Sequence, residues 1–167
     1  MDFDVTAALA LLVSTISVGL SVWAIVSQRE HNRLSVRPLC EVTPSDYRNK
    51  IKLVLKNNGI GPLIVKKFTV SDGSQESNGV ADLVPPLPHN RAWDDFEYIP
   101  PGRSLPPGEE IVLLELTERA GDPSFVEARD IARSALSKMT IRIDFTDVYG
   151  KNVASFEKAL AWYGRHE

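Results

Sequence analysis

Residues 5–26 read VTAALALLVSTISVGLSVWAIV, a run of 22 positions without a charged side chain. An α-helix needs about 20 mostly apolar residues to cross the hydrocarbon core of a bilayer. The sequence after this run is polar enough for a water-soluble domain. The run therefore divides the chain into a short tail at 1–4, a transmembrane helix at 5–27, a basic juxtamembrane linker at 28–38 and a compact domain at 39–167.

A cleavable signal peptide is the main alternative reading of this run. Such a peptide starts with a basic stretch, has a shorter apolar segment of about 7–15 residues and ends at a small-residue cleavage site. Here Asp2 and Asp4 make the leading stretch acidic, and SQREHNRLSVRP follows the run. A helix buried in a soluble core would show a polar face, whereas this run offers only hydroxyl groups. The sequence favours a retained membrane anchor.

Charge on the two flanks of the run predicts its orientation. Arg29, Arg33 and Arg37 follow the run, and basic flanks stay on the cytoplasmic side. We expect a bacterial inner-membrane protein with the tail outside and the C-terminal domain in the cytoplasm. Cys40 is the only cysteine, so no intrachain disulfide can form, which fits a reducing compartment. Trp23 and the three arginines are expected to contact lipid headgroups.

A stripe of small residues recurs within the run at alternating spacings of three and four. The stripe consists of Ala7, Ala10, Ser14, Ser17, Ser21 and Ala24. This spacing places the six on one helix face, where small side chains let membrane helices approach closely and hydroxyls can bond across the interface. A run rich in small residues can also produce such a stripe by chance. We interpret the stripe as the seam of a homo-oligomer.

Alternation of apolar and polar residues predicts short strands in the domain. In KIKLVLK at 50–56, apolar side chains alternate with lysines, and NNGIGP at 57–62 predicts a turn whose glycines supply positive φ. The turn signals PPGEE at 106–110 and DVYGKN at 147–152 flank further strands, the second as a hairpin. Besides 50–56, strands are expected at 39–43, 62–70, 111–116, 140–145 and 153–157.

One helix interrupts these strands. Residues 124–137 carry apolar side chains at helical spacing, and Asp122 before Pro123 is a plausible helix cap. Residues 79–104 are less regular, and we expect the aromatic stretch 91–98 to cover an open edge or one end of a sheet. The predicted fold is mainly β behind an N-terminal transmembrane helix: an antiparallel β-sandwich carrying one inserted helix.

Three segments carry a resemblance to known proteins. The turn KNNGIGPLIV at 56–65, the strand start LPPGEEIVLL at 105–114 and the hairpin IRIDFTDVYGKN at 141–152 resemble bacterial immunoglobulin-like β-sandwich modules. With the basic stretch HNRLSVRP at 31–38, the chain also resembles a group of uncharacterised bacterial proteins with a single membrane span and a small cytoplasmic β-domain. The resemblance implies an immunoglobulin-like sandwich, and it implies no reaction.

Residues that could carry catalysis form no recognisable set. His31, His89 and His166 lie far apart in the sequence, and none has a partner at metal-ligand spacing. There is no nucleophile elbow, Walker loop or dinucleotide-binding fingerprint. We therefore predict no catalytic, cofactor-binding or metal-binding residues, and a protein that is not an enzyme.

Positive charge is concentrated on the membrane side of the domain. Residues 28–67 hold nine Lys or Arg against three acids, whereas residues 68–167 hold ten against 17. A row of outward lysines is usually a solvated face or an edge protected against aggregation. It could also hold a phosphate-bearing ligand. The residues of this possible anionic-ligand surface are Lys50, Lys52, Lys56, Lys66 and Lys67.

Two functions are compatible with these features. The first is a non-enzymatic binding or scaffold module that faces the cytoplasm and self-associates through its membrane helix. The second is a ligand-gated membrane effector, for example in bacterial antiphage defence, whose domain senses a charged nucleotide and whose assembled helices perturb the inner membrane. The expected partners are membrane lipid, further copies of the chain, and either a protein or a small anionic nucleotide. Duplex nucleic acid is not expected.

Overall fold

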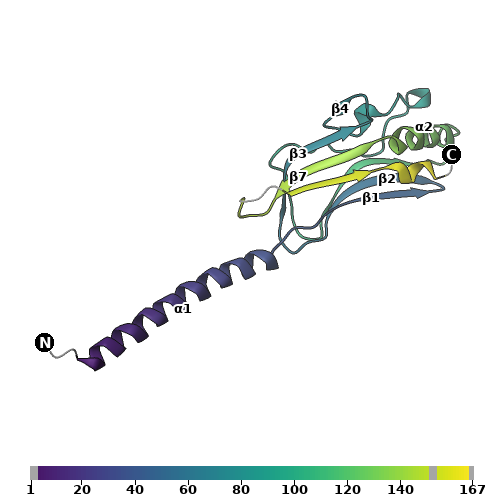
Figure 1. Cartoon of the computed structure of the whole chain (residues 1–167). Helices are drawn as coiled ribbons and strands as arrows, with labels where there is room; N and C mark the ends of the chain where they lie inside the picture. The colour runs from purple at the N-terminus through teal and green to yellow at the C-terminus, as the bar shows by residue number, and fades with distance from the viewer. Residues whose placement is uncertain (1–3, 151–153, 166–167) are drawn as a thin grey trace. The chain divides into compact units, whose positions relative to one another are not determined.

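The computed structural model describes residues 4–150 and 154–165, except for the Arg33 side chain, in two compact units (Figure 1). Residues 1–36 form the first unit, whose described part contains one helix, and residues 37–167 form the second unit, which contains the β-domain. Asp2 of the acidic tail, Val153 at the start of the last predicted strand, and His166 lie outside the described residues.

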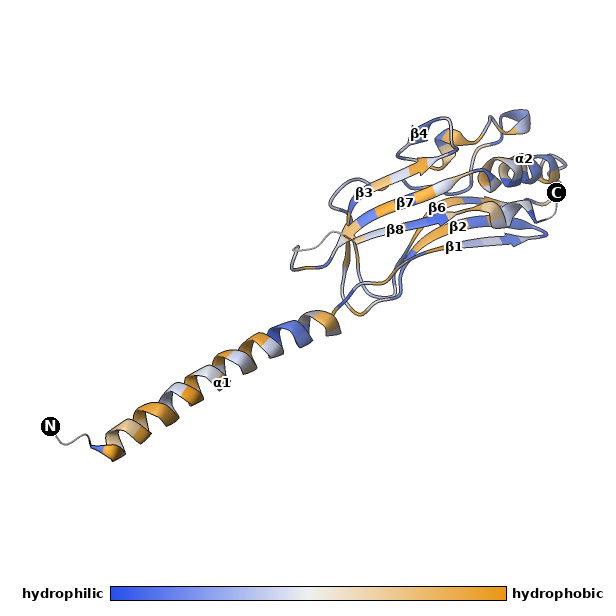
Figure 2. Ribbon diagram, in the orientation of Figure 1, coloured by the Kyte–Doolittle hydropathy of each residue, from blue (hydrophilic) through white to orange (hydrophobic). Residues whose placement is uncertain are grey.

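Helix α1 (Val5–Ser35) is unbroken and begins at Asp4, whose carboxylate accepts a hydrogen bond from the Thr6 backbone N–H at 3.1 Å. By length and composition it can cross a membrane. Figure 2 shows its hydrophobic residues giving way to hydrophilic ones toward its C-terminal end. The segment expected as a linker is thus helical as far as Ser35, because QREHNRLS contains no Gly or Pro and the first helix breaker is Pro38.

The β-domain contains two antiparallel sheets. The first has the strand order β1 (Cys40–Tyr47), β2 (Lys50–Asn57) and β6 (Glu110–Thr117). The second has the order β4 (Glu76–Ser77), β3 (Leu63–Ser71), β7 (Thr140–Thr146) and β8 (Ala154–Ala159), and β5 (Ser104–Leu105) pairs with the start of β3. The expectation of a mainly β chain with an N-terminal apolar helix is confirmed.

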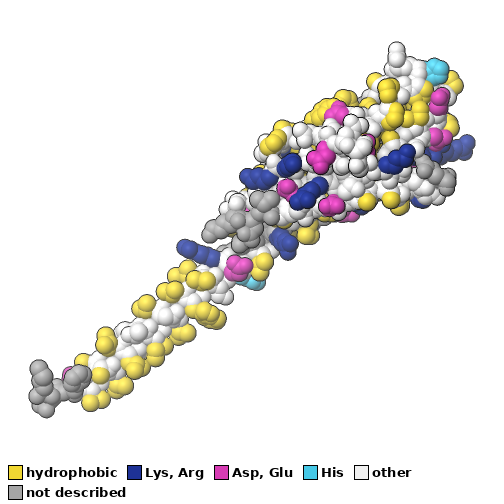
Figure 3. Space-filling view, turned by 45° about the horizontal axis from the view of Figure 1, so that its top comes forward, with side chains coloured by type: hydrophobic (Ala, Val, Ile, Leu, Met, Phe, Trp, Pro, Cys, Tyr) yellow, Lys and Arg dark blue, Asp and Glu magenta, His cyan; other side chains and the backbone are white. Residues whose placement is uncertain are grey.

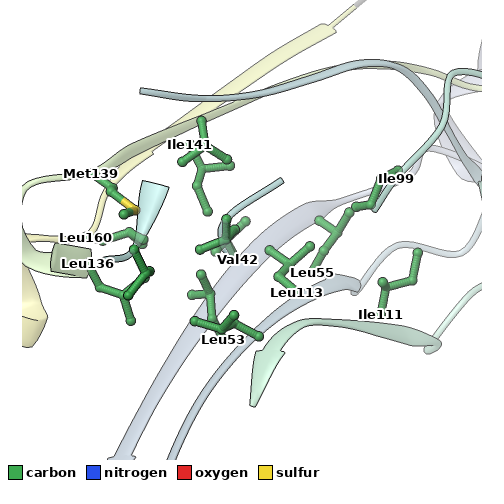
Figure 4. Close-up of a cluster of buried hydrophobic side chains, with 14 of the residues drawn as sticks. Val42, Leu53, Leu55, Ile99, Ile111, Leu113, Leu136, Met139, Ile141 and Leu160 are labelled. Carbon is green, nitrogen blue, oxygen red and sulfur yellow. The ribbon is translucent and has the colours of Figure 1, made fainter. Parts of the chain in front are cut away.

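Side chains from both sheets form one core, part of which is drawn in Figure 4. Leu53 and Leu55 of β2, Leu113 of β6 and Ile141 of β7 are at most 1% exposed. Full burial of one such side chain contributes about 1.5–3 kcal/mol to stability. The apolar residues whose alternation with lysines predicted β2 are therefore the residues whose side chains enter the core, and the lysines lie on the outer face of the sheet.

Helix α2 (Phe125–Ser137) lies in the connection between β6 and β7 and adds apolar side chains to the core. The N-cap of α2 is Ser124 and the helix begins at Phe125, so the expected cap at Asp122 with Pro123 as the first helical residue is not found; Asp122 lies just before the helix, where its Oδ1 accepts hydrogen bonds from the Ser124 backbone N–H at 2.9 Å and the Ser124 hydroxyl at 2.5 Å. The described part of the domain also contains three short 3-10 helices: η1 (Ala81–Leu83), η2 (Pro88–Asn90) and η3 (Ala161–Gly164).

The turn after β2 is organised by the buried side chain of Asn57. Its Nδ2 donates to the carbonyl oxygens of Gly61 and Leu105 at 2.8 and 3.0 Å, and its Oδ1 accepts from the Gly59 N–H at 3.0 Å. A Cβ on Gly59 would lie 2.4 Å from the Arg37 carbonyl oxygen, and the φ of Gly59 is not positive. The expectation of a left-handed backbone at Gly59 and Gly61 is wrong, because neither has a positive φ. At Gly59, glycine is required because the backbone of residues 37–39 passes close to it.

Candidate functional site

The five lysines proposed to bind an anion do not lie together. They belong to strands of different sheets: Lys50, Lys52 and Lys56 to β2, and Lys66 and Lys67 to β3. The Lys50 Nζ lies 2.6 Å from Glu115, and the Lys52 Nζ lies 3.1 Å from Glu110. Because β6 supplies glutamates opposite the lysines of β2, this face offers an anion little net positive charge.

The hydroxyls of the small-residue stripe in α1 already have acceptors. Ser14, Ser17 and Ser21 each donate to the carbonyl oxygen four residues earlier, at 2.8 Å. None of these hydroxyls needs a partner from another helix. If copies of α1 associate along this face, the gain comes from close packing of small side chains.

The residues expected at lipid headgroups lie in the C-terminal half of α1 or just beyond its end. Trp23 is exposed on the helix, and Arg29 follows it within the same helix. Arg37 lies after the helix end, at the start of the β-domain. The Arg33 side chain lies outside the described part of the chain.

Groups that could carry chemistry are either dispersed or paired. Within residues 4–150 and 154–165, no three His, Cys, Asp or Glu side chains are placed to hold a metal ion. Burial raises the pKa of the Cys40 thiol to about 12, which keeps it protonated and weakly nucleophilic near neutral pH. The fully buried carboxylate of Asp46 lies 2.7 Å from Arg133 and 3.1 Å from Arg165, so it joins β1 to α2 and to the C-terminal segment.

The aromatic stretch 91–98 runs beside β6. Asp95 forms an isolated bridge with Glu115, and the Asp94 N–H donates to the Glu115 carbonyl oxygen at 3.0 Å. The Asp94 carboxylate accepts from the Thr117 N–H at 2.7 Å. Of the two expected positions, an open edge or one end of a sheet, the backbone of residues 94–95 lies along the open edge of β6.

Phe96 and Tyr98 of this stretch form an exposed aromatic pair. Their side chains are 46% and 48% exposed, and their rings meet edge to face with centroids 5.8 Å apart. Figure 3 shows where hydrophobic side chains, in yellow, reach the surface of the domain. Two large aromatic side chains left in contact at a surface are typical of a protein-binding patch.

Tyr98 is held in place by contacts on two sides. Its hydroxyl donates to the Asp82 carboxylate, which also accepts from the Ser77 hydroxyl at 2.5 Å. The Tyr98 ring lies against Gly79, where a Cβ would approach a ring carbon to 2.2 Å. The hydrogen bonds from Ser77 and Tyr98 lower the pKa of the Asp82 carboxyl, and the bond to Asp82 raises the pKa of Tyr98. A side chain fixed in this way loses little entropy when a partner covers it.

A groove of about 520 Å³ opens beside Tyr98. Its walls are largely apolar and carry two polar side chains; the lining residues are Lys67, Phe68, Asn78, Tyr98, Ile99, Pro100 and Pro101. Binding sites are typically concave and mostly apolar, with a few placed polar groups. Lys67, one of the five lysines proposed from the sequence, is thus part of this candidate site.

The other parts of this site were not predicted. Phe96 and Tyr98 alternate with Glu97 just before Pro100 and Pro101, and this spacing was the only local signal. The groove depends on β3 and on the 98–101 segment, which are distant in sequence. No protein-family model matches the chain, and no curated protein is similar to it in sequence. The function must therefore be inferred from the geometry of the chain itself.

Proposed function

We propose that the protein is a non-enzymatic binding or scaffold module, anchored in a bacterial inner membrane by α1 and facing the cytoplasm with its β-domain. The main support is the exposed Phe96–Tyr98 pair, held in place beside an apolar groove. Aromatic side chains are enriched at protein interfaces because they bury a large area and lose few rotamers. The module would recruit a protein partner to the membrane surface.

The domain of this module is proposed to be immunoglobulin-like, and the strand order supports this. β1, β2 and β6 correspond to strands A, B and E of that fold, and β3, β7 and β8 correspond to strands C, F and G. In this reading α2 is the one inserted helix, placed between strands E and F. The fold by itself does not define a function, so the proposal depends on the surface of the domain.

The proposed orientation follows from the basic flank after the apolar run. Alkaline phosphatase fused to the C-terminus should be inactive, because the enzyme needs an oxidising compartment, and a fluorescent protein fused at the same place should fluoresce. An active phosphatase fusion would contradict the proposed orientation. It would indicate that the β-domain, with its aromatic pair, lies outside the cytoplasm.

Self-association through α1 belongs to the same proposal, with membrane lipid and further copies of the chain as partners. The effector alternative, in which a nucleotide gates the assembled helices, has less support. Lys50 and Lys52 are already paired with glutamates, and the five lysines lie on two sheets. Dye release from vesicles carrying the full-length protein, triggered by an added nucleotide, would favour the effector instead.

Site-specific photo-crosslinking in intact cells tests recruitment directly. A benzophenone amino acid replaces Phe96 in the full-length protein, and Tyr47, which is 64% exposed in the β1–β2 hairpin, is the matched control. We expect a discrete crosslinked protein from position 96, none from position 47, and a smaller yield at 96 when Tyr98→Ala is added. Equal products from both positions, or none from either, would refute the proposed binding surface.

A further inference from the structure

We propose that β8 is a free sheet edge through which two copies of the protein pair, strand against antiparallel strand. This inference rests on the self-association in the proposed function and names a second surface for it. Its basis is the direction of the backbone groups along β8, the exposure of the residues that carry them, and the charges that each alignment of two β8 strands brings together.

The backbone of β8 directs alternate residues away from its sheet. β8 is the last strand of the sheet, and β7 lies on its one paired side (Figure 2). The Leu160 N–H, just beyond the strand, donates to the Met139 carbonyl oxygen at 2.8 Å, which is on the β7 side. Because the backbone groups of an antiparallel strand point alternately to the two sides, every second residue before Leu160 also faces β7. The residues between them point their N–H and C=O groups outward; they are Ser155, Glu157 and Ala159.

These outward groups are open to solvent. Ser155, Glu157 and Ala159 are all exposed, in contrast to the partly buried residues that alternate with them. Ala159 has only a methyl side chain, so its exposure means that solvent reaches the strand itself. Within residues 4–150 and 154–165, nothing forms a hydrogen bond with the outward N–H or C=O groups of these three residues.

The two edge strands of the other sheet are protected where β8 is not. The Val42 carbonyl oxygen of β1 accepts from Lys158, and Glu115 of β6 bonds to the backbone of residues 94–95. An uncovered edge strand is a template for pairing with another chain. Contact of one strand with the same strand of a second copy gives the isologous, two-fold interface that most homo-oligomers use.

The charges along β8 favour one alignment of two copies. In a two-fold pair centred on Phe156, Ser155 lies opposite Glu157 of the second copy, and Ala154 lies opposite its Lys158. Centring the pair on Glu157 or on Lys158 instead places two like charges opposite each other, which destabilises a strand pair. The alignment centred on Phe156 pairs residues 154–158 of both copies and opposes no like charges.

Lys158 is the residue that could oppose this pairing, because an inward-pointing charge commonly protects an edge strand. Its ammonium is already bound to the Val42 carbonyl oxygen of its own chain at 2.7 Å. In the alignment centred on Phe156 it faces only the methyl group of Ala154. The two Phe156 side chains, which are partly buried against the core, meet at a non-hydrogen-bonded position, where opposite side chains lie closest.

Disulfide crosslinking in isolated membranes tests the alignment. Two differently tagged full-length copies, both with Cys40→Ala, are coexpressed, one with Ser155→Cys and the other with Glu157→Cys. Opposite Cα atoms of a hydrogen-bonded pair are about 5.5 Å apart, which a disulfide can bridge. We expect the mixed disulfide, and little product from two copies with the same cysteine, because those positions are offset by two residues along the strand. Equal yields in all three samples, or no mixed disulfide, would overturn the inference.

Proline at position 157 tests the open edge. The Glu157 N–H points away from β7, so Glu157→Pro preserves the β7 ladder and removes only an outward donor. Both this variant and the control Glu157→Ala, which keeps the N–H, are made with Ser14→Leu and Ser21→Leu so that α1 does not mask the effect. By sedimentation in detergent, the proline should raise the dimer Kd about tenfold and the alanine less than about twofold. Equal Kd values would contradict the paired edge.

Hydrogen exchange of the original protein gives a readout that needs no substitution. The N–H groups of Ser155 and Glu157 should exchange slowly in the dimer and rapidly after dilution to the monomer, whereas the Leu160 N–H should stay protected in both. Slow exchange at Ser155 and Glu157 in the monomer would show that the edge is not open. Photo-crosslinking at Phe96 is independent of these results, so recruitment of a partner can hold when pairing through β8 fails.

Discussion

The Lys158 ammonium of β8 donates a hydrogen bond of 2.7 Å to the Val42 carbonyl oxygen of β1. These are edge strands of different sheets, so the bond joins the two sheets at an open side of the sandwich. Further along β1, Arg165 donates to the Asp46 carbonyl oxygen at 3.4 Å, and Pro44 between them has no N–H. The backbone groups of Val42, Pro44 and Asp46 that face away from β2 are therefore occupied or missing, and another strand cannot pair with β1 along this edge.

Replacing Lys158 by Met should lower the free energy of unfolding by about 1–2 kcal/mol. Met keeps most of the apolar stem, but the Val42 carbonyl oxygen loses a charged donor. Denaturant unfolding of the full-length protein in detergent, followed by tryptophan fluorescence, measures the change. Lys56→Met is the matched control and should stay within about 0.5 kcal/mol of the original protein. An equal loss in both variants would show that the bond to Val42 contributes nothing.

Gly59→Ala should destabilise the domain by about 3 kcal/mol, because the added methyl group meets the backbone of residues 37–39 and a tightly packed backbone cannot move away cheaply. Gly73→Ala serves as the comparison: its φ is +90°, but the space around it is open. That variant should lose only about 1–2 kcal/mol from backbone strain. Circular dichroism melting of both variants checks the order, and a larger loss at Gly73 would contradict the close approach at Gly59.

Cys40 should react slowly with iodoacetamide in the folded protein. Its pKa is raised to about 12, so at pH 8 almost all of the thiol is protonated and labelling should be about 100-fold slower than for a free thiol. The folded state holds this proton more tightly than the unfolded chain, whose thiol ionises near pH 8.5. The contribution of Cys40 to stability therefore falls as the pH rises above that value.

Mass spectrometry of the labelled protein measures this rate. The control is Ser155→Cys in a Cys40→Ala background, where the new thiol lies at an exposed position on β8. It should label rapidly under the same conditions, as should Cys40 in denaturant. Rapid labelling of Cys40 in the native protein would mean that its thiol is not desolvated.

Ser14→Leu combined with Ser21→Leu should weaken self-association of the full-length protein at least tenfold, if copies pack along the small-residue stripe. Bulky side chains prevent close approach of helices, whereas lipid accommodates added volume on the opposite face, so Leu12→Phe should be tolerated. The helix itself should persist, because the lost hydroxyl bonds lie within one helix. Crosslinking through single cysteines at Ser17 and Val18, with Cys40 replaced by Ala, maps the face. Equal crosslinking at both positions would eliminate the stripe as an interface.

Local patterns predicted the strands well and the candidate site poorly, for one physical reason. The alternation in β2 reports burial directly, since every second side chain enters the core. The pairing of Lys50 with Glu115 joins residues 65 positions apart, so a lysine row that looked available in sequence is neutralised in the fold. The hydrogen bond between Tyr98 and Asp82 spans 16 residues of irregular backbone, which no periodicity describes.

The junction after the apolar run was also missed, because a change in polarity suggested a linker where the backbone continues as a helix. Since α1 is continuous through Ser35, its small-residue face extends past Ala24 to Gln28, His31 and Ser35 at the same spacings. Ser35 lies about 14 Å beyond Val26 along the helix axis. If α1 spans a membrane and copies associate along its small-residue face, reagents directed at Ser35, beyond the candidate span, would report which face the copies share.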